Sequence, residues 1–262
     1  MDYIESIFLG IVQGLTEFLP ISSSGHIEIA KVFFQNNYSS EENLTFTIIL
    51  HFATALSTII YFRRDITEIF SSLFQKSYNQ SHKFSISIII SMIPAVIVGL
   101  FFEKQINSFF SGNLTLVGSM LLITGLLLLI SDFVQFDKKK ITFKNSFFIG
   151  LSQAIAILPG ISRSGATIAT AVIIGVDREK AARFSFLMVV PLIFGGMFKS
   201  ILYTDINFEN FDLITVILGF FSAFFTGLLA CRWMITLVKK SKLYYFSIYC
   251  FVVGLFLVFY TL

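Results

Sequence analysis

Two short polar motifs interrupt apolar stretches of this chain and hold the side chains best suited to chemistry. The first, QGLTEFLPISSSGH at residues 13–26, combines an amide, a carboxylate, hydroxyls and an imidazole. The second, LPGISRSGATI at residues 158–168, places an arginine between two serines. Hydroxyl, imidazole and carboxylate groups can supply a nucleophile and carry protons, and a guanidinium binds phosphate oxygens. The two motifs together predict a site that acts on a phosphate group.

The first motif places a titratable group within an apolar stretch. Gln13 and Glu17 are four residues apart, so they share one face of a helix. A carboxylate at membrane depth is costly and usually marks function, although a structural role for Glu17 is the alternative. The remaining polar side chains of the motif are Ser22, Ser23, Ser24 and His26. Taken alone, they also fit a simple N-capped turn with a satisfied histidine.

Arg163 favours a functional interpretation of both motifs. A guanidinium in the turn of an apolar hairpin needs an anionic partner, which is either Glu17 or a ligand. Its planar fork suits two phosphate oxygens, whereas a structural Arg163–Glu17 ion pair is the alternative. We expect an anionic phosphate ligand. The expected phosphate-binding residues are Ser22, Ser24, Ser162, Arg163, Ser164 and Thr167.

Other reactive side chains have simpler explanations. His51, near the start of an apolar segment, either lines the cavity of the site or packs in the core or at an interface, and we expect packing. Glu28 and Lys31 are three residues apart and can form a local ion pair. The only two cysteines lie in or beside apolar segments without a CxxC spacing, so we expect both to be packing residues.

The two motifs occupy matching places in an internal repeat. A shift of 140 positions aligns identical residues at Gly10, Gln13, Ile21, Ser22, Ser24 and Gly25 with Gly150, Gln153, Ile161, Ser162, Ser164 and Gly165. Broken hydrophobic segments at matching places in two halves are typical of a membrane-buried site between inverted repeats. We predict one membrane domain, 1–262, with repeats at about 1–132 and 141–262.

The composition predicts an integral membrane protein. Of 262 residues, 55% are hydrophobic and 13% are charged, and the mean hydropathy is +0.82. The apolar run 27–34 is much shorter than the roughly 20 residues a spanning helix needs, so each motif is predicted to turn a re-entrant hairpin. The predicted fold is all-α, with six full transmembrane helices and two re-entrant helical hairpins arranged as an inverted repeat. The predicted spans are 44–62, 84–102, 114–131, 184–201, 213–230 and 243–262.

The placement of charge predicts the orientation. Most of the 19 Lys and Arg residues follow the first, third and fifth predicted spans or the second hairpin. By the positive-inside rule, the first hairpin opens to the outside and the second to the cytoplasm, so the two turns can meet within the membrane. Basic residues confined to loops also argue against nucleic-acid binding.

The pair of motifs resembles the signatures of the bacterial undecaprenyl-diphosphate phosphatase family, also called the bacitracin-resistance protein family. The likeness extends over essentially the whole chain. It implies hydrolysis of undecaprenyl diphosphate to undecaprenyl phosphate and inorganic phosphate, which recycles the lipid carrier for peptidoglycan synthesis. It also implies a plasma-membrane enzyme with an outward-facing site and a divalent metal ion, Mg²⁺ or Ca²⁺.

The same resemblance implies roles for individual residues. Gln13 and Glu17 match the family's (Glu/Gln)xxxGlu motif and are the candidate metal ligands. Ser23 and His26 match its candidate nucleophile and catalytic histidine, and Arg163 matches its phosphate-binding arginine. Gln13 is an amide where many members have a second carboxylate, and an amide oxygen can ligate a metal but cannot act as a base. The nucleophile is left open between Ser23, His26 and water.

Three other functions are compatible with parts of the pattern. A lipid-phosphate transporter or flippase would need the same inverted repeats and phosphate clamp. The other class of membrane phosphatase shares Ser-Gly-His and Ser-Arg, but no Arg-Pro occurs here and no histidine follows Arg163. A purely structural protein leaves a buried arginine and carboxylate unexplained. The sequence leaves the oligomeric state open, with a homodimer as one alternative.

Overall fold

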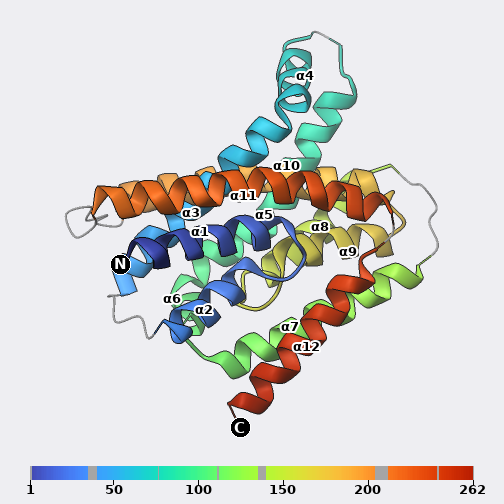
Figure 1. Ribbon diagram of the computed structural model, residues 1–262. Helices are drawn as coiled ribbons and strands as arrows, with labels where there is room; N and C mark the ends of the chain where they lie inside the picture. Colours follow the sequence, from blue (N-terminus) through green and yellow to red (C-terminus); the bar gives the residue numbers. More distant parts are fainter. Residues whose placement is uncertain are drawn as a thin grey trace.

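Every regular element of the structure, a computed structural model, is an α-helix within the residues it describes (Figure 1). These residues are 2–34, 40–75, 77–110, 112–134, 140–203, 212–240 and 242–261. The helices are α1 (Tyr3–Phe18), α2 (Ser23–Phe33), α3 (Ser40–Tyr61), α4 (Arg63–Leu73), α5 (Gln80–Phe101), α6 (Glu103–Phe109), α7 (Leu114–Phe133), α8 (Phe143–Ile155), α9 (Arg163–Ile173), α10 (Arg178–Tyr203), α11 (Leu213–Lys239) and α12 (Tyr244–Tyr260). The prediction of an all-α protein is confirmed.

The first motif turns the chain between α1 and α2. Helix α1 ends at Phe18, two residues before Pro20, whose ring cannot continue a helix. Ser22 then caps α2, because its hydroxyl accepts a hydrogen bond from the Gly25 N–H at 3.2 Å. The 11 residues of α2 are too few to cross a bilayer.

The second motif also turns the chain between two helices, α8 and α9. Ser162 caps α9 by accepting a hydrogen bond from the Gly165 N–H at 3.1 Å. Gly160 precedes the cap with φ 96°, a backbone conformation that glycine adopts readily. Ser22 and Ser162 are 140 positions apart, so the sequence repeat is also a repeat of helix caps.

Each hairpin packs closely against a long helix from the other half of the chain. Helix α1 lies along α11, and a Cβ atom on Gly10 would come within 2.4 Å of the Gly219 carbonyl oxygen. Helix α8 lies along α5, and a Cβ atom on Gly150 would come within 2.4 Å of the Ser91 carbonyl oxygen. Small residues therefore permit backbone-to-backbone contact at matching positions of the two hairpins.

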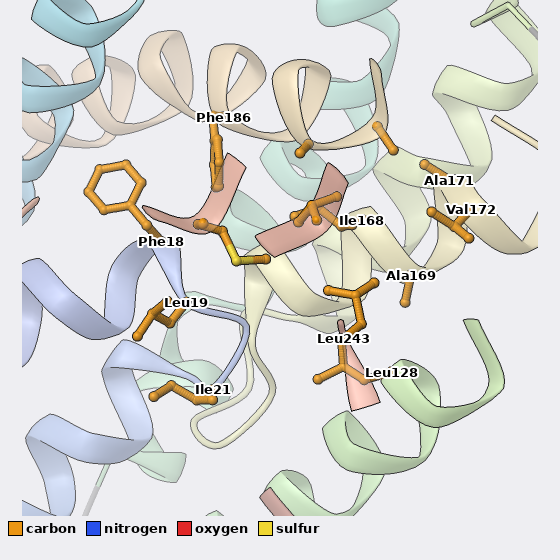
Figure 2. Close-up of a cluster of buried hydrophobic side chains, with 14 of the residues drawn as sticks. Phe18, Leu19, Ile21, Leu128, Ile168, Ala169, Ala171, Val172, Phe186 and Leu243 are labelled. Atoms are coloured by element: carbon orange, nitrogen blue, oxygen red, sulfur yellow. The ribbon is translucent and has the colours of Figure 1, made fainter. Parts of the chain in front are cut away.

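An apolar core surrounds the hairpin turns (Figure 2). Phe18, Leu19 and Ile21 of the first turn belong to one buried cluster with Ile168 of α9 and Phe186 of α10. This core fixes the two turns relative to each other. The outer faces of the bundle are also apolar, since exposed side chains include Ile89, Phe225 and Phe256. Lipid is the solvent that such a surface requires.

Four helices in the described parts of the chain are long and apolar enough to cross a membrane: α5, α7, α10 and α11. The number is five if α3 and α4, which are bent by 75° where they join, count as one span. Helix α12 is apolar but only 17 residues long. The chain is a multi-pass membrane protein, and the predicted number of six spans with two re-entrant hairpins stays a prediction.

Several segments predicted as charged loops are helical. Helices α4 and α6 occupy two of them, and Figure 1 shows α4 projecting from the bundle with the first turns of α5. Helix α10 begins at Arg178 rather than at 184, and α11 continues to Lys239 rather than ending at 230. Lys and Arg are good helix formers, so a helix can continue past them. A charged residue therefore indicates where the chain leaves the apolar layer of the membrane and not where the helix ends.

Candidate active site

The two hairpin turns meet at the carboxylate of Glu17. Its Oε1 accepts a short hydrogen bond from Arg163, and its Oε2 accepts one from the Ser23 hydroxyl at 2.8 Å. The Glu17 side chain is 7% exposed and that of Arg163 is 16% exposed. The expectation that the turns approach each other within the protein is confirmed. Ser23 and Arg163 are the first residues of α2 and α9, and they are 140 positions apart.

Gln13 and His51 complete the surroundings of this carboxylate. Gln13 Nε2 donates to Glu17 Oε2 at 3.1 Å and lies 3.0 Å from His51 Nδ1. His51 Nδ1 itself lies 3.5 Å from Glu17 Oε2. His51 therefore lines the site, the alternative to the expected packing role, because α3 packs against α1 and brings the imidazole to the carboxylate.

Gln13 also has an unused acceptor. Its side chain is fully buried, and its Oε1 has no hydrogen-bond partner. No group of three His, Cys, Asp or Glu residues in the described part of the chain could hold a metal ion. Mg²⁺ in phosphate sites, however, needs only one or two protein ligands, because substrate phosphates and water complete its shell. Gln13 Oε1 and the Glu17 carboxylate are oxygen ligands of the type that such a cation takes, and a metal at this site stays a prediction.

His26 lies beside this centre but bonds to other groups. Its Nδ1 is 2.8 Å from the Ser22 carbonyl oxygen, and its Nε2 is 2.7 Å from the Tyr249 hydroxyl. The two rings are stacked, with centroids 5.6 Å apart. A carbonyl oxygen only accepts, so Nδ1 carries a proton and donates to Ser22, while Nε2 shares its hydrogen bond with the Tyr249 hydroxyl. The Ser23 hydroxyl thus donates to Glu17 rather than to His26.

Tyr249 was absent from the residues expected from the sequence. It lies on α12, 223 positions after His26, and it is one of nine tyrosines in an aromatic-rich chain. Tyrosine near a membrane interface is common. The spacing of residues therefore gave no signal that could have distinguished it.

The predicted phosphate-binding hydroxyls form matching pairs in the two turns. The hydroxyls of Ser22 and Ser24 are 3.3 Å apart, and those of Ser162 and Ser164 are 3.2 Å apart. Ser22 and Ser162 also cap their helices, which engages their oxygens. Ser24 is half-buried, whereas the other three are buried. A role of these hydroxyls in phosphate binding stays a prediction.

Ser185 on α10 braces the arginine side of the site. Its carbonyl oxygen accepts from Arg163 Nη1 at 3.3 Å, and its hydroxyl lies 2.7 Å from that of Thr167. Thr167 is completely buried, so this contact fixes α9 against α10. The guanidinium is consequently held from one side by α10 and from the other by Glu17.

Comparison with known proteins identifies the family to which this chain belongs. The family model described as "Bacitracin resistance protein BacA" matches residues 6–256, which include both motifs. The chain is 56% identical over 255 residues to an undecaprenyl-diphosphatase of Christiangramia forsetii, with 97% of each chain covered. It is 45% identical over 260 residues to one from Bacteroides fragilis, covering 97% of this chain and 96% of the relative. It is 38% identical over 272 residues to one from Methanobrevibacter smithii, again covering 97% and 96%. The chain with the Glu17–Arg163 centre therefore belongs to the BacA bacitracin resistance protein family.

Proposed function

We propose that this protein hydrolyses undecaprenyl diphosphate to undecaprenyl phosphate and inorganic phosphate at the Glu17–Arg163 centre. Its relatives at up to 56% identity are named undecaprenyl-diphosphatase. The observation that carries the proposal is a nearly buried Arg163–Glu17 ion pair whose carboxylate also holds the Ser23 hydroxyl. The reaction returns the lipid carrier to peptidoglycan synthesis and thereby supports resistance to bacitracin.

Substrate binding changes the partner of Arg163. The terminal phosphate offers oxygens that match the two-pronged geometry of the guanidinium. When Arg163 binds the phosphate in place of Glu17, the carboxylate loses one hydrogen-bond donor. Glu17 then becomes a better acceptor for the Ser23 proton. The undecaprenyl tail remains among the apolar side chains on the outside of the bundle.

Ser23 is the proposed nucleophile. Its oxygen bonds to the terminal phosphorus and its proton passes to Glu17, while the anhydride P–O bond breaks and undecaprenyl phosphate leaves. Water then cleaves the phosphoserine and releases inorganic phosphate, with His26 as a proton carrier. Direct attack by water gives the same products, but it leaves activity in a Ser23→Ala variant and no phosphoserine in the wild type.

A divalent cation, Mg²⁺ or Ca²⁺, would be held by Gln13 and Glu17 and would offset the negative charge of the diphosphate. A chelator should abolish turnover, and adding back the cation should restore it. Gln13→Ala should raise the cation concentration needed for half-maximal activity. The calorimetric affinity for the cation in the presence of inorganic phosphate provides a readout that does not depend on turnover.

The proposed location is the plasma membrane, with the first motif open to the outside. Loop charge supports this orientation, because the basic loops lie on the side of the second hairpin. Undecaprenyl diphosphate released by cell-wall polymerisation would then reach the site without crossing the membrane.

Phosphate release by the purified protein in detergent tests the proposed function. Undecaprenyl diphosphate should give equal amounts of undecaprenyl phosphate and inorganic phosphate. Arg163→Ala should lower the rate by about 100-fold or more, as loss of a group that stabilises transition-state charge does. Arg64→Ala, at an exposed position of α4, is the matched control. Near-normal activity of the Arg163 variant contradicts the proposed site, and no release by the wild type would indicate a transporter.

A further inference from the structure

A second basic site lies away from the Glu17–Arg163 centre. A cavity of about 350 Å³ opens where the projecting α4 meets α5, α10 and the chain just before α8. Its lining includes Lys83 of α5, Lys140, and Lys180 and Arg183 of α10. It shares no lining residue with the predicted catalytic or phosphate-binding groups.

The charge of this cavity is unbalanced. Four cationic side chains line it with one carboxylate, Glu68. None of Lys83, Lys140 and Lys180 has a salt-bridge partner in the parts of the chain that the structure describes. Clustered lysines repel one another unless an anion lies between them. The arrangement therefore favours a negatively charged ligand.

Two polar groups of the cavity lining lack a hydrogen-bond partner. Ser87 is 1% exposed, and its hydroxyl has no partner. Arg183 pairs with Asp65 at 2.5 Å through Nη2, but its buried Nε has no partner. Buried polar groups are rarely left unsatisfied, so each unsatisfied donor points to a missing ligand or water.

We propose that this cavity binds a phosphate group, carried either by a lipid headgroup or by free phosphate. Lysine ammonium groups, a guanidinium N–H and a hydroxyl are the donors that phosphate oxygens accept from. The cavity is large enough for such a group, since small-molecule sites occupy about 300–1,000 Å³. Ile69, Phe84 and Ile141 add apolar walls, which suit the glycerol and chain carbons that adjoin a lipid phosphate.

The cavity is joined to the catalytic centre through α10. Arg183 lines the cavity, and Ser185, two residues later, accepts a hydrogen bond from Arg163. By loop charge the cavity lies on the cytoplasmic side, opposite to the proposed substrate entrance. It is therefore a second phosphate site on the other side of the membrane and not an extension of the first.

Binding measurements on the full chain test the proposal. One arm uses radiolabelled inorganic phosphate with protein in phosphatidylcholine nanodiscs, and the other counts bound phosphatidic acid by native mass spectrometry. Lys83→Gln, Lys180→Gln and Ser87→Ala should each weaken binding at the second site by about 3- to 10-fold, as loss of one phosphate contact does. Lys104→Gln, an exposed lysine of α6, removes the same charge elsewhere and should change nothing.

The outcomes separate the two phosphate sources. Loss of phosphatidic acid binding alone identifies a lipid headgroup as the ligand, and loss of inorganic phosphate binding alone identifies free phosphate. Unchanged binding of both probes in all three cavity variants overturns the proposal. Detergent-phase phosphatase activity and thermal melting should stay at wild-type levels, which shows that the variants fold and that the catalytic centre is intact. A defect at the catalytic centre would instead lower activity in these assays, so the two proposals fail separately.

Discussion

One carboxylate organises the chemistry of the site. Glu17 accepts hydrogen bonds from Arg163, Ser23 and Gln13. Ser23 and Arg163 occupy equivalent places in the two repeats, but the residue equivalent to Glu17 in the second repeat is the apolar Ile157. Both repeats therefore contribute a turn and a helix start to the site, but only the first repeat contributes a carboxylate. The two repeats therefore form one catalytic centre between them and not two.

Glu17→Gln keeps the shape of the side chain but removes its charge. Loss of the proton acceptor should lower kcat by about 100-fold. Inorganic phosphate should inhibit the variant several-fold more strongly than the wild type, because Arg163 no longer has a competing carboxylate. Steady-state kinetics with added phosphate measure both effects. Weaker inhibition together with the lower kcat would show that Glu17 helps to bind phosphate, and would contradict the exchange of partners by Arg163.

Tyr249→Phe removes the hydroxyl at His26 Nε2 and keeps the stacked ring. As a positioning residue, Tyr249 should affect kcat by about 10-fold with little change in KM, since it orients the imidazole and does not touch the substrate. Thermal stability should be unchanged. Tyr245→Phe, at an exposed position one turn earlier, is the control. An equal fall in activity for both variants would exclude a specific role of the Tyr249 hydroxyl.

An anionic partner for Arg163 could be predicted from sequence because an isolated charge in an apolar hairpin requires one, but the sequence left open whether this partner is Glu17 or a ligand. The positions of His51 and Tyr249 could not be predicted. Each reaches the site from a helix that is distant in sequence, and neither has a local spacing that sets it apart. Residue spacing therefore predicts which side chains share one face of a helix. It does not predict which side chains of distant helices, such as His51 and Tyr249, pack against them.

At the scale of the elements, small residues set the distance between each hairpin and its neighbour. Gly10 and Gly150 both face a backbone carbonyl oxygen of the partner helix. Backbone atoms cannot move aside as a flexible side chain can, so a larger residue must push the helices apart.

Gly150→Ala should therefore destabilise the protein by about 1–3 kcal/mol, as overpacking does in a well-packed interior. Gly99→Ala provides the matched control, because a Cβ atom there has no neighbour within 4 Å. That substitution should be neutral or slightly stabilising, since alanine favours helix. Thermal melting in detergent compares the two variants. Equal melting temperatures would show that α8 and α5 do not approach as closely as described.

The turns between α1 and α2 and between α8 and α9 were predictable because proline, glycine and serine caps act locally. The extent of the long helices was not. Arg178 is the first residue of α10 and Arg232 lies within α11, so charged residues belong to these helices rather than to the loops beside them. Helix α4 was missed for the same reason, since its charged start suggested a loop while its apolar residues recur at helical spacing.

At the scale of the whole molecule, charge placement predicts which ends of the helices share a side of the membrane. Tyr78, between α4 and α5, is 66% exposed, and Leu213, at the start of α11, is 70% exposed. The first follows a basic region and the second follows an acidic one. The positive-inside rule places them on opposite sides.

Single cysteines at these positions test the topology. Leu213→Cys should react with a membrane-impermeant maleimide in intact cells, and Tyr78→Cys should react only in inverted vesicles. Both native cysteines, Cys231 and Cys250, are completely buried, so the wild-type chain should remain unlabelled and serves as the control. The reverse pattern of labelling would show that the proposed substrate entrance faces the cytoplasm.

The packing of α1 against α11 has a consequence for biosynthesis. The Ser6 hydroxyl donates to the Thr215 carbonyl oxygen, 209 positions further along the chain, and the Gly10 contact lies on the same face. A ribosome therefore delivers α1 to the membrane long before its final neighbour exists. Helix α1 must therefore wait, with its polar face unmatched, until α11 has been made.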